Sequence, residues 1–489
     1  MKPGGGLVRR VRGLRRPVRS LVELSSPPVD LGEFVRRSGE LVVQPRMGFG
    51  SPTRMRAGLA ATKRASATTV GTITLDSYTR VGDLAAAERA LRDGDELNGY
   101  PIVSHGPAVT GRVLAGIRDE GFPVQVRHGS AAPREIFAAL VALGINATEG
   151  GPVSYCLPYG RTPLAESVRN WAECAERFTA LREAGAEPHL ETFGGCMLGQ
   201  LCPPSQLVAI SVLEALFFHR HGLRSLSVSY AQQTNPDQDR EAVLALRRLC
   251  SQLLPVPSWH VVIYAYMGAY PVTVAGATRL LGKAAELAVT TGAERLIVKT
   301  VAESRRIPTI AENVAALEHA ATIARRTAPA PLPPAPLPLA VPAVPPAAAA
   351  PVTCVLPAVP LAAVARMDHS HGRTGQMVHP RETGLAAGAD SQTYRESAAL
   401  VDAVLNLDTD LGTALLRAFE RGVLDIPYCV HPDNAGRTRS YVDGDGWLRW
   451  AELGSLPLRH LVPRVTSRRI TSAGLLADLS YVRRTFDIQ

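Results

Sequence analysis

The chain has 489 residues, 46% of them hydrophobic, and a formal net charge of +9 at pH 7. This size and apolar content predict a globular protein with a large core and exclude a wholly disordered chain. The sequence has neither a signal-peptide pattern nor an apolar run of about eighteen residues, so we expect a cytoplasmic protein without a membrane partner.

Arginine carries almost all of the positive charge, and much of it lies between Arg9 and Arg19. Binding of nucleic acid or a membrane by such a segment requires interleaved aromatic residues or an apolar face, and both are missing here. We therefore interpret residues 1–39 as a disordered basic tail and expect no nucleic-acid partner.

The seven cysteines are an odd number and include no Cys-x-x-Cys pair. This pattern is typical of reduced thiols rather than of a disulfide framework or a zinc site, so we expect no metal site. We interpret Cys156 as a small apolar side chain rather than a nucleophile, because no histidine can be placed beside it from the sequence.

Between residues 40 and 326, short β-branched runs alternate with amphipathic helical runs. The strand-like runs include Leu41–Pro45, Thr72–Leu75, Val124–Val126, Leu143–Ala147, His260–Tyr264 and Leu296–Val298. The helical runs include Leu84–Leu91, Pro133–Leu143, Val168–Ala184, Ser205–His219, Asp239–Leu254, Thr278–Thr291 and Ile310–Arg326. Because polar groups follow the strand-like runs, the pattern predicts a parallel α/β barrel with its site at one mouth. Nine strand candidates stand against the eight that a (β/α)8 TIM barrel requires.

The remaining residues form two further segments. Residues 327–366 are rich in Pro and Ala, and proline at this density prevents both helix and sheet, so we expect an extended, semi-rigid linker. Residues 367–489 are predicted to be a small mixed C-terminal region, helical from Gln392 to Gly422 and with a turn at Asp433–Gly436.

Three arginines and one carboxylate follow predicted strands, namely Arg46, Arg80, Arg127 and Glu149. Guanidinium groups bind carboxylates in bidentate fashion and do not lose their proton, so they suit a fixed anion clamp. A carboxylate beside them can accept a substrate ammonium or act as a base. The combination fits a dicarboxylic amino acid, and the alternative for each arginine taken singly is an ordinary surface salt bridge.

A series of short motifs resembles the large (epsilon) subunit of glutamate mutase in order and approximate spacing. They are Gln44-Pro45-Arg46-Met47-Gly48, Tyr78-Thr79-Arg80, Leu97-Asn98-Gly99-Tyr100-Pro101, Arg127-His128-Gly129, Glu149-Gly150-Gly151, Ser154-Tyr155, Pro158-Tyr159, Glu191-Thr192-Phe193-Gly194, Pro203-Pro204-Ser205, Met267-Gly268, Val298-Lys299-Thr300 and Ile307-Pro308-Thr309. The resemblance covers nearly the whole chain apart from the basic tail and the Pro/Ala-rich linker.

This resemblance implies a TIM barrel that works with adenosylcobalamin and interconverts L-glutamate and 3-methylaspartate by a radical rearrangement. It implies a substrate pocket of Arg46, Arg80, Arg127, His128, Glu149, Tyr155 and Tyr159, with Glu149 as the catalytic residue. It also implies cofactor contacts from Gly48, Asn98, Pro158, Tyr270, Lys299, Glu303 and Ile307.

The resemblance further implies a partner, because the family's cobalamin motif, Asp-x-His-x-x-Gly, belongs to a separate small (sigma) subunit. The segment Asp368-His369-Ser370-His371-Gly372 has a different spacing, and we interpret it as polar linker residues. We therefore expect a heterotetramer of two large and two small subunits.

One departure from the family pattern bears on the substrate. Tyr264-Ala265-Tyr266 stands where the family has His-Gln-Trp, and Pro152 replaces a glycine. Two alternatives therefore stay open: a mutase relative that acts on another amino acid, and a non-catalytic homologue that binds a dicarboxylic amino acid.

Overall fold

The computed structural model describes residues 29–158, 160–194, 201–330, 391–462 and 470–488. Most of the predicted basic tail, the linker from residue 331 onward, Tyr159 and the Asp368–Gly372 segment lie outside these residues. Nothing in the structure therefore bears on those predictions.

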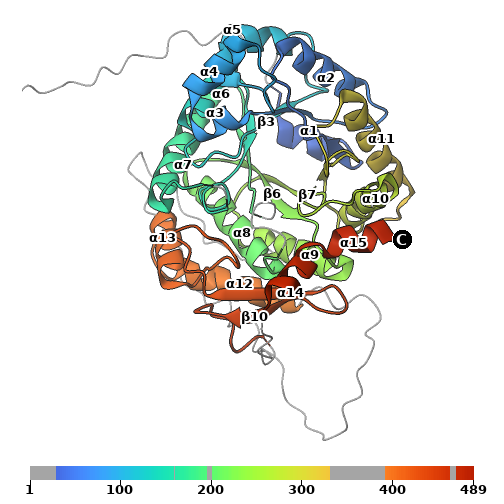
Figure 1. Ribbon diagram of the computed structural model, residues 1–489. Coiled ribbons are helices and arrows are strands. Elements are labelled where there is room, and N and C mark those ends of the chain that lie inside the picture. The colour runs from blue at the N-terminus through green and yellow to red at the C-terminus, as the bar shows by residue number, and fades with distance from the viewer. Residues whose placement is uncertain (1–28, 159, 195–200, 331–390, 463–469, 489) are drawn as a thin grey trace, which may run out of the picture.

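Eight parallel strands form the centre of the molecule (Figure 1). They are β1 (Val42–Gln44), β2 (Gly71–Thr74), β3 (Val124–Arg127), β4 (Ala147–Glu149), β5 (His189–Glu191), β6 (Ser225–Ala231), β7 (Ser258–Tyr264) and β8 (Arg295–Ile297). Their order is β1-β8-β7-β6-β5-β4-β3-β2, and a parallel bridge joins Val43 of β1 to Thr69, which lies just before β2. The predicted (β/α)8 TIM barrel is confirmed, with eight strands in place of nine candidates.

Helices surround this barrel on all sides (Figure 1). They are α2 (Pro52–Arg64), α3 (Ser77–Val81), α4 (Leu84–Asp93), α5 (Ile102–Leu114), α6 (Arg134–Leu143), α7 (Leu164–Phe178), the 3-10 helix η1 (Thr179–Ala184), α8 (Pro204–Arg220), α9 (Pro236–Leu253), α10 (Val274–Thr290) and α11 (Ile310–Arg326). Because the strands are covered by helices, every residue of β6 is buried. The helical runs expected from the sequence are all present.

Two sequence predictions need correction at their boundaries. The predicted tail ends earlier than residue 39, because helix α1 (Leu31–Arg37) is capped by Asp30 and buries Leu31 and Val35 beneath the barrel. The predicted strand Leu143–Ala147 begins later, since Leu143 still belongs to α6. Gly144 then ends that helix with a φ of 61°, a conformation that glycine adopts without strain.

Helix α5 was not predicted, and its sequence explains why. Gly106 and Pro107 lie inside it, and both residues oppose a continuous helix. The backbone of Gly106 is in fact non-helical, with a φ of 70°, so α5 consists of two helical pieces joined at a kink.

The C-terminal region packs on the outside of the barrel. It contains α12 (Gln392–Leu405), α13 (Leu411–Arg421), the antiparallel hairpin β9 (Thr438–Val442) with β10 (Leu448–Leu453), α14 (Ser472–Leu479) and α15 (Tyr481–Ile488). Helix α12 lies against α8 and α9, and its Leu400 and Val401 belong to the same hydrophobic core as the barrel residues. The helical prediction for Gln392–Gly422 is confirmed, with a break between the two helices.

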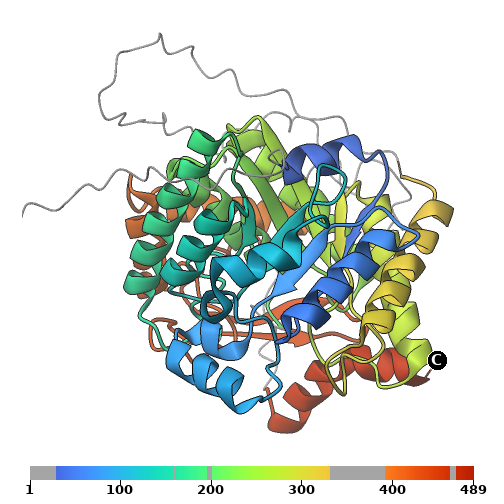
Figure 2. The same cartoon turned by 90° about the horizontal axis from the view of Figure 1, so that it is seen from above.

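The two ends of the barrel differ. Helices α3, α14 and α15 lie at the end where the strands terminate, whereas α1 covers the opposite end (Figure 2). Asp487 of α15 accepts hydrogen bonds from the backbone N–H groups of Val272 and Thr273, which fixes α15 beside the start of α10. Within the described residues, no helix combines the length and apolar character needed to cross a membrane.

Candidate active site at the barrel mouth

Four buried polar side chains meet where strands β3, β4, β5 and β7 end. Arg127 forms an ion pair with Glu149, at 2.9 Å between Nη2 and Oε2. Its Nη1 lies 4.0 Å from Oε1 of Glu191 and donates to the Tyr264 hydroxyl at 2.9 Å. These residues meet because each is the last residue of its strand, and parallel strands end at the same face of a barrel.

Tyr264 joins the two carboxylates of this cluster. Its hydroxyl oxygen lies 2.8 Å from Oε2 of Glu149 and also contacts Oε1 of Glu191. The Tyr155 hydroxyl donates to the other oxygen of Glu149. We call Arg127, Glu149, Glu191, Tyr155 and Tyr264 the mouth cluster.

A second buried arginine lies beneath the mouth cluster. Arg295 forms an ion pair with Glu191 through Nη2 and Oε2, and both side chains are 0% exposed. Arg295 also donates to Oγ of Ser227 at 3.0 Å and to Oε1 of Gln125 at 3.2 Å. Because Gln125 and Ser227 both bond to Oε2 of Glu191 as well, the barrel interior is a connected polar network.

The two carboxyl groups experience opposite electrostatic environments. Burial raises the pKa of Glu149; Arg127 opposes this shift, and the negative charge of Glu191 adds to it. Burial also disfavours ionisation of Glu191, but Arg295 and Arg127 together hold the pKa of this carboxyl below its usual range. Glu149 is therefore the group that gains a proton first.

His128 follows β3 and faces the cluster from the side. Its ring stacks on Trp171, with the centroids 5.6 Å apart, and contacts the edge of Tyr155. Burial, with the nearby charges of Arg127 and Arg80, lowers the pKa of His128 to about 3, so the ring is neutral. Nδ1 accepts the Ser130 N–H at 3.1 Å, so Nε2 carries the hydrogen, and among the described residues this donor has no partner.

The structure brings a predicted substrate residue next to two predicted cofactor residues. Because β1 pairs with β8, Arg46 lies beside the loop that carries Lys299 and Glu303. Oε2 of Glu303 is 3.5 Å from Nζ of Lys299 and 3.8 Å from Nη1 of Arg46. The ammonium of Lys299 also lies 5.1 Å from the ring centroid of Tyr270.

Several buried hydrogen-bonding groups at this mouth have no partner among the described residues. They are Nε of Arg46, Oγ1 of Thr74, Nε of Arg80, Nε2 of His128 and the hydroxyl groups of Tyr266 and Tyr270. Buried polar groups in proteins are normally satisfied, so a cluster of unsatisfied ones marks a place where a polar ligand binds. Thr74 ends β2, and the other residues that carry these groups follow β1, β2, β3 and β7.

The other predicted cofactor residues lie on or near the rim. Asn98 is exposed, and its side chain accepts the Ser77 N–H at 2.9 Å. Pro158 is half-buried, and Ile307 is 48% exposed. A Cβ atom at Gly48 would lie 2.1 Å from the Thr74 carbonyl oxygen, so the close approach of the loop after β1 to the end of β2 already requires glycine there.

The loop after β4 is held by a carboxylate that sequence reasoning missed. Glu214 of α8 accepts the N–H groups of Val153 and Ser154 at 3.0 and 2.9 Å and the Ser154 hydroxyl at 2.9 Å. Glu214 is the single carboxylate of the largely apolar α8, but nothing in the sequence indicates which group it binds. Arg295 was missed for a different reason: it is one of many arginines in the sequence.

Cys156 requires a correction, because a histidine does lie beside it. Nε2 of His431, from the C-terminal region, is 4.0 Å from Sγ of Cys156. The thiol nevertheless donates to the Thr162 carbonyl at 3.1 Å, and burial raises its pKa to about 12. Cys156 is therefore a thiol at neutral pH, which agrees with a packing role rather than a nucleophilic one.

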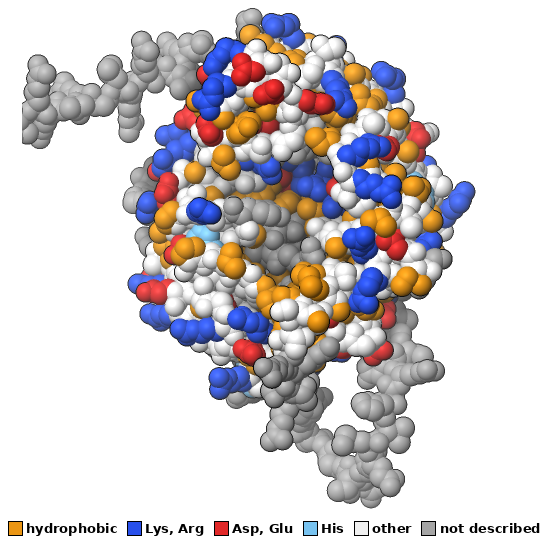
Figure 3. Space-filling model, in the orientation of Figure 1, with side chains coloured by type: hydrophobic (Ala, Val, Ile, Leu, Met, Phe, Trp, Pro, Cys, Tyr) orange, Lys and Arg blue, Asp and Glu red, His pale blue; other side chains and the backbone are white. Residues whose placement is uncertain are grey.

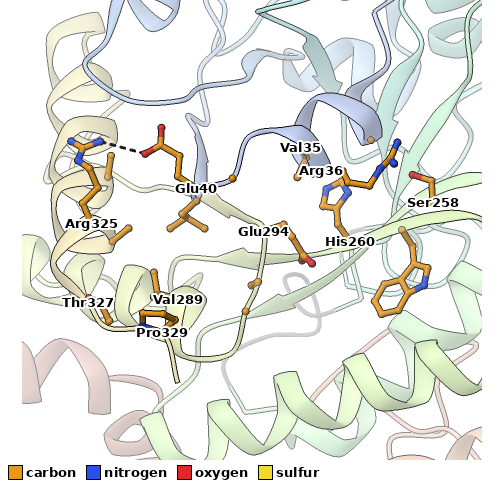
Figure 4. A pocket seen from close by; sticks show the side chains of 18 of the residues that line it. Val35, Arg36, Glu40, Ser258, His260, Val289, Glu294, Arg325, Thr327 and Pro329 are labelled. Carbon is orange, nitrogen blue, oxygen red and sulfur yellow. Dashed lines mark ion pairs between the residues drawn. The ribbon is translucent and has the colours of Figure 1, made fainter. Parts of the chain in front are cut away.

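A separate cavity lies away from this mouth. It has a volume of about 590 Å3 and lies at the opposite end of the barrel, between α1, β7, β8 and α11 (Figure 4). Its walls include Trp259, His260 and an ion pair between Arg325 and Glu40, 3.9 Å apart. By contrast, the mouth face is hollowed at its centre, and Lys and Arg side chains lie along the rim (Figure 3). Across the described ranges, no group of three metal-binding side chains is present.

Comparison with known proteins identifies the family of this chain. The family model described as Methylaspartate mutase E chain (MutE) matches residues 32–329 and 379–479. The glutamate mutase epsilon subunit of Halobacterium salinarum is 30% identical over 405 residues, which is 81% of this chain and 74% of that protein. Those of Yersinia enterocolitica and Haloarcula marismortui are 28% and 27% identical, over 79% and 81% of this chain and 72% of each relative. The family match covers far more than half of the sequence, and the chain therefore belongs to the methylaspartate mutase E chain family.

Proposed function

We propose that this chain is the catalytic large subunit of an adenosylcobalamin-dependent mutase that interconverts L-glutamate and 3-methylaspartate in the cytoplasm. The observation that carries the proposal is the buried Arg127–Glu149 pair at the barrel mouth, surrounded by hydrogen-bonding groups without partners among the described residues. A mutase that works on a dicarboxylic amino acid needs fixed cations for two carboxylates and an acceptor for one amine.

The substrate residues have complementary tasks. Arg80 and Arg46 each keep a buried Nε–H without a partner in the described part of the chain, and these donors suit the carboxylates of the substrate. The Nε2–H of His128 is a neutral donor beside them. Glu149 is the acceptor for the substrate amine, held in place by Arg127 and Tyr155.

The rim residues fit the cofactor. Lys299, Glu303 and the Tyr270 hydroxyl, which has no partner in the described part of the chain, offer charged and polar contacts for a sugar. The 48% exposed Ile307 offers an apolar surface for a flat ring. Gly48, Asn98 and Pro158 complete this set. When bound, adenosylcobalamin supplies the radical chemistry of the rearrangement. The chain's own residues bind and orient the substrate and keep water out of the mouth.

A small cobalamin-binding subunit is the proposed partner, within a heterotetramer of two large and two small subunits. Exposed apolar side chains surround the mouth: Val81 on α3 is 78% exposed, Val274 at the start of α10 is 64% exposed, and Ile307 lies after β8. Apolar groups on loops around one opening suit a broad, flat partner that covers it.

The decisive experiment combines the purified chain with a small cobalamin subunit, adenosylcobalamin and L-glutamate under anaerobic conditions, and follows 3-methylaspartate. Arg80→Ala and Glu149→Gln are expected to lower kcat/KM by about a hundredfold or more, because each removes a charged contact to the substrate. Arg134→Ala is the control, since Arg134 pairs with Glu173 on the exposed outside of the barrel. A fully active Arg80→Ala variant would refute the proposed clamp.

The contact between Tyr264 and Glu149 favours one alternative, a mutase that acts on another amino acid. The phenol occupies space beside the proposed amine acceptor and changes the room that a substrate side chain has there. A stable complex with the small subunit that turns over a different amino acid, and not L-glutamate, would support this alternative.

A further inference from the structure

The hydroxyl oxygen of Tyr264 contacts two carboxyl groups and one guanidinium group. It accepts a hydrogen bond from Nη1 of Arg127 at 2.9 Å. It lies 2.8 Å from Oε2 of Glu149 and is also in contact with Oε1 of Glu191. A phenol has a single hydrogen, so it can donate to only one of the two carboxyl groups.

The second contact therefore needs a hydrogen from elsewhere. A carboxylate is an acceptor only, and a phenol oxygen that has already given its hydrogen is also only an acceptor. Two acceptors at hydrogen-bonding distance repel one another, and the repulsion is strong in a dry interior. The contact becomes favourable when one of the two carboxyl groups is protonated and donates to the Tyr264 oxygen.

Glu191 is the carboxyl group that stays ionised. Its Oε2 accepts from Arg295, from Ser227 at 3.1 Å and from Gln125 at 3.2 Å, and its Oε1 faces Arg127 at 4.0 Å. Glu149 has one cation, Arg127, which it shares with Glu191. The remaining hydrogen therefore belongs on Glu149.

We propose that Glu149 is a protonated carboxylic acid in the substrate-free protein, donating to the Tyr264 oxygen, and that a cationic substrate amine displaces this proton into solvent when it binds. The proton on Oε2 of Glu149 leaves as the ammonium takes its place. The net charge at the carboxyl group therefore stays the same, because one proton is lost for each ammonium that binds. The second half of this inference rests on the proposed function, and the first half does not.

The groups that face Glu149 from each neighbouring element agree with this assignment. Arg127 comes from β3, Glu191 from β5, Tyr264 from β7 and Tyr155 from the loop after β4. One cation thus faces one anion and two phenols. Burial and the charge of Glu191 both raise the pKa of Glu149, and Arg127 opposes them.

A protonated Glu149 distinguishes between ligands with and without an amine. A dicarboxylate that carries an ammonium displaces the proton and gains the charge of Glu149. A dicarboxylate without an amine, such as glutarate, leaves the proton where it is and gains only the arginine contacts. The Glu149–Tyr264 pair therefore selects for the amine of the ligand, and proton release measures that selection.

Infrared difference spectroscopy at pH 7 tests the protonation without any ligand. The spectrum of the wild-type chain minus that of Glu149→Gln is expected to contain the carbonyl band of a protonated carboxyl group, shifted in D2O. Glu173→Gln, on the exposed surface, should show no such band in its difference spectrum. Tyr264→Phe provides a second variant that keeps Glu149, and the band is expected to move because the carboxyl group loses its acceptor. Absence of the band from the wild-type-minus-Glu149→Gln spectrum overturns the proposal.

Calorimetry tests the release step on the full chain. L-Glutamate is titrated at pH 7 in two buffers of different ionisation enthalpy, and release of about one proton per ligand is expected. Glutarate should bind with no release. Binding of L-glutamate without proton release overturns the release step. If neither ligand binds, the proposed substrate is wrong, while the infrared experiment still decides whether Glu149 is protonated.

Discussion

The carboxylate of Glu191 and the guanidinium of Arg295 form an ion pair in which neither side chain reaches solvent. Glu191 is the last residue of β5, whereas Arg295 is the first residue of β8, so the pair spans the interior of the barrel. Arg295 thereby holds the carboxylate that the mouth cluster shares through Tyr264. The site at the mouth thus depends on a charge near the other end of the barrel.

This ion pair predicts that loss of Arg295 alone destabilises the protein strongly, and that loss of both partners costs less than the two single losses added together. Arg295→Met leaves the Glu191 carboxylate buried with a more distant cation, so we expect a loss of about 3–5 kcal/mol in the free energy of unfolding. The double variant Glu191→Gln/Arg295→Met is expected to lose less than the sum of the two single variants, because no uncompensated charge remains. Urea unfolding measures both effects.

The exposed pair Arg134–Glu173 is the matched control for this prediction. Its side chains are roughly half exposed, so Arg134→Met should change the free energy of unfolding by about 1 kcal/mol or less. Equal losses for Arg295→Met and Arg134→Met would contradict a special role for the buried pair.

The sequence allowed the barrel to be predicted, because hydrophobic periodicity and strand-end polar residues are local signals. Arg127 and Glu149 could be placed together for the same reason: each lies at the end of a strand, and all strands of a parallel barrel end at one face. The partner of Glu191 could not be predicted, because Arg295 lies 104 residues away in the sequence and begins its strand rather than ending it. Such a pairing depends on barrel closure and on side-chain reach across the interior.

The loop after β4 leads to a second prediction. A Cβ atom at Gly151 would lie 2.1 Å from Oε1 of Glu214, the carboxylate that holds this loop. Gly151→Ala must therefore displace a buried acceptor of backbone N–H groups, and we expect a loss of about 1–3 kcal/mol in the free energy of unfolding.

A glycine in a helix provides the control for Gly151→Ala. No atom lies within 4 Å of a Cβ added at Gly111 in α5, so Gly111→Ala should be neutral or stabilise the protein by up to about 1 kcal/mol. Thermal unfolding of the two variants compares them directly. A Gly151→Ala variant as stable as Gly111→Ala would show that Glu214 does not fill the space beside Gly151.

The pKa of Glu214 gives a third prediction, on stability and pH. Burial raises this pKa to about 7, from 4.5 in an exposed glutamate, although hydrogen bonds from Ser154 and Val153 oppose the shift. Between about pH 4.5 and 7 the folded protein therefore binds more protons than the unfolded chain, so this group's contribution to stability falls as the pH rises. Buried Asp239, whose pKa is raised to about 7, contributes with the same sign.

Glu214→Gln should remove part of this pH dependence. For each protein, the free energy of unfolding is measured at pH 5 and at pH 7.5. The decrease between these two pH values is expected to be larger in wild type than in Glu214→Gln, by at most about 3 kcal/mol. Urea unfolding at the two pH values measures it, and Glu173→Gln on the exposed surface should leave the wild-type slope unchanged. Identical slopes for wild type and Glu214→Gln would mean that Glu214 is ionised throughout.

The contacts of Glu303 with Lys299 and Arg46 lead to the last prediction, which rests on the proposed cofactor. Lys299→Met removes a charged contact at the rim, so the complex with the small subunit should bind adenosylcobalamin about ten- to a hundredfold more weakly. Glu303→Gln should weaken cofactor binding and also raise the KM for substrate, because Arg46 loses the carboxylate that lies 3.8 Å from it. Spectroscopic titration with adenosylcobalamin measures the first effect. Lys283→Met is the control, since Lys283 pairs with Glu286 on the exposed face of α10, and equal affinities for both lysine variants would exclude Lys299 from the cofactor site.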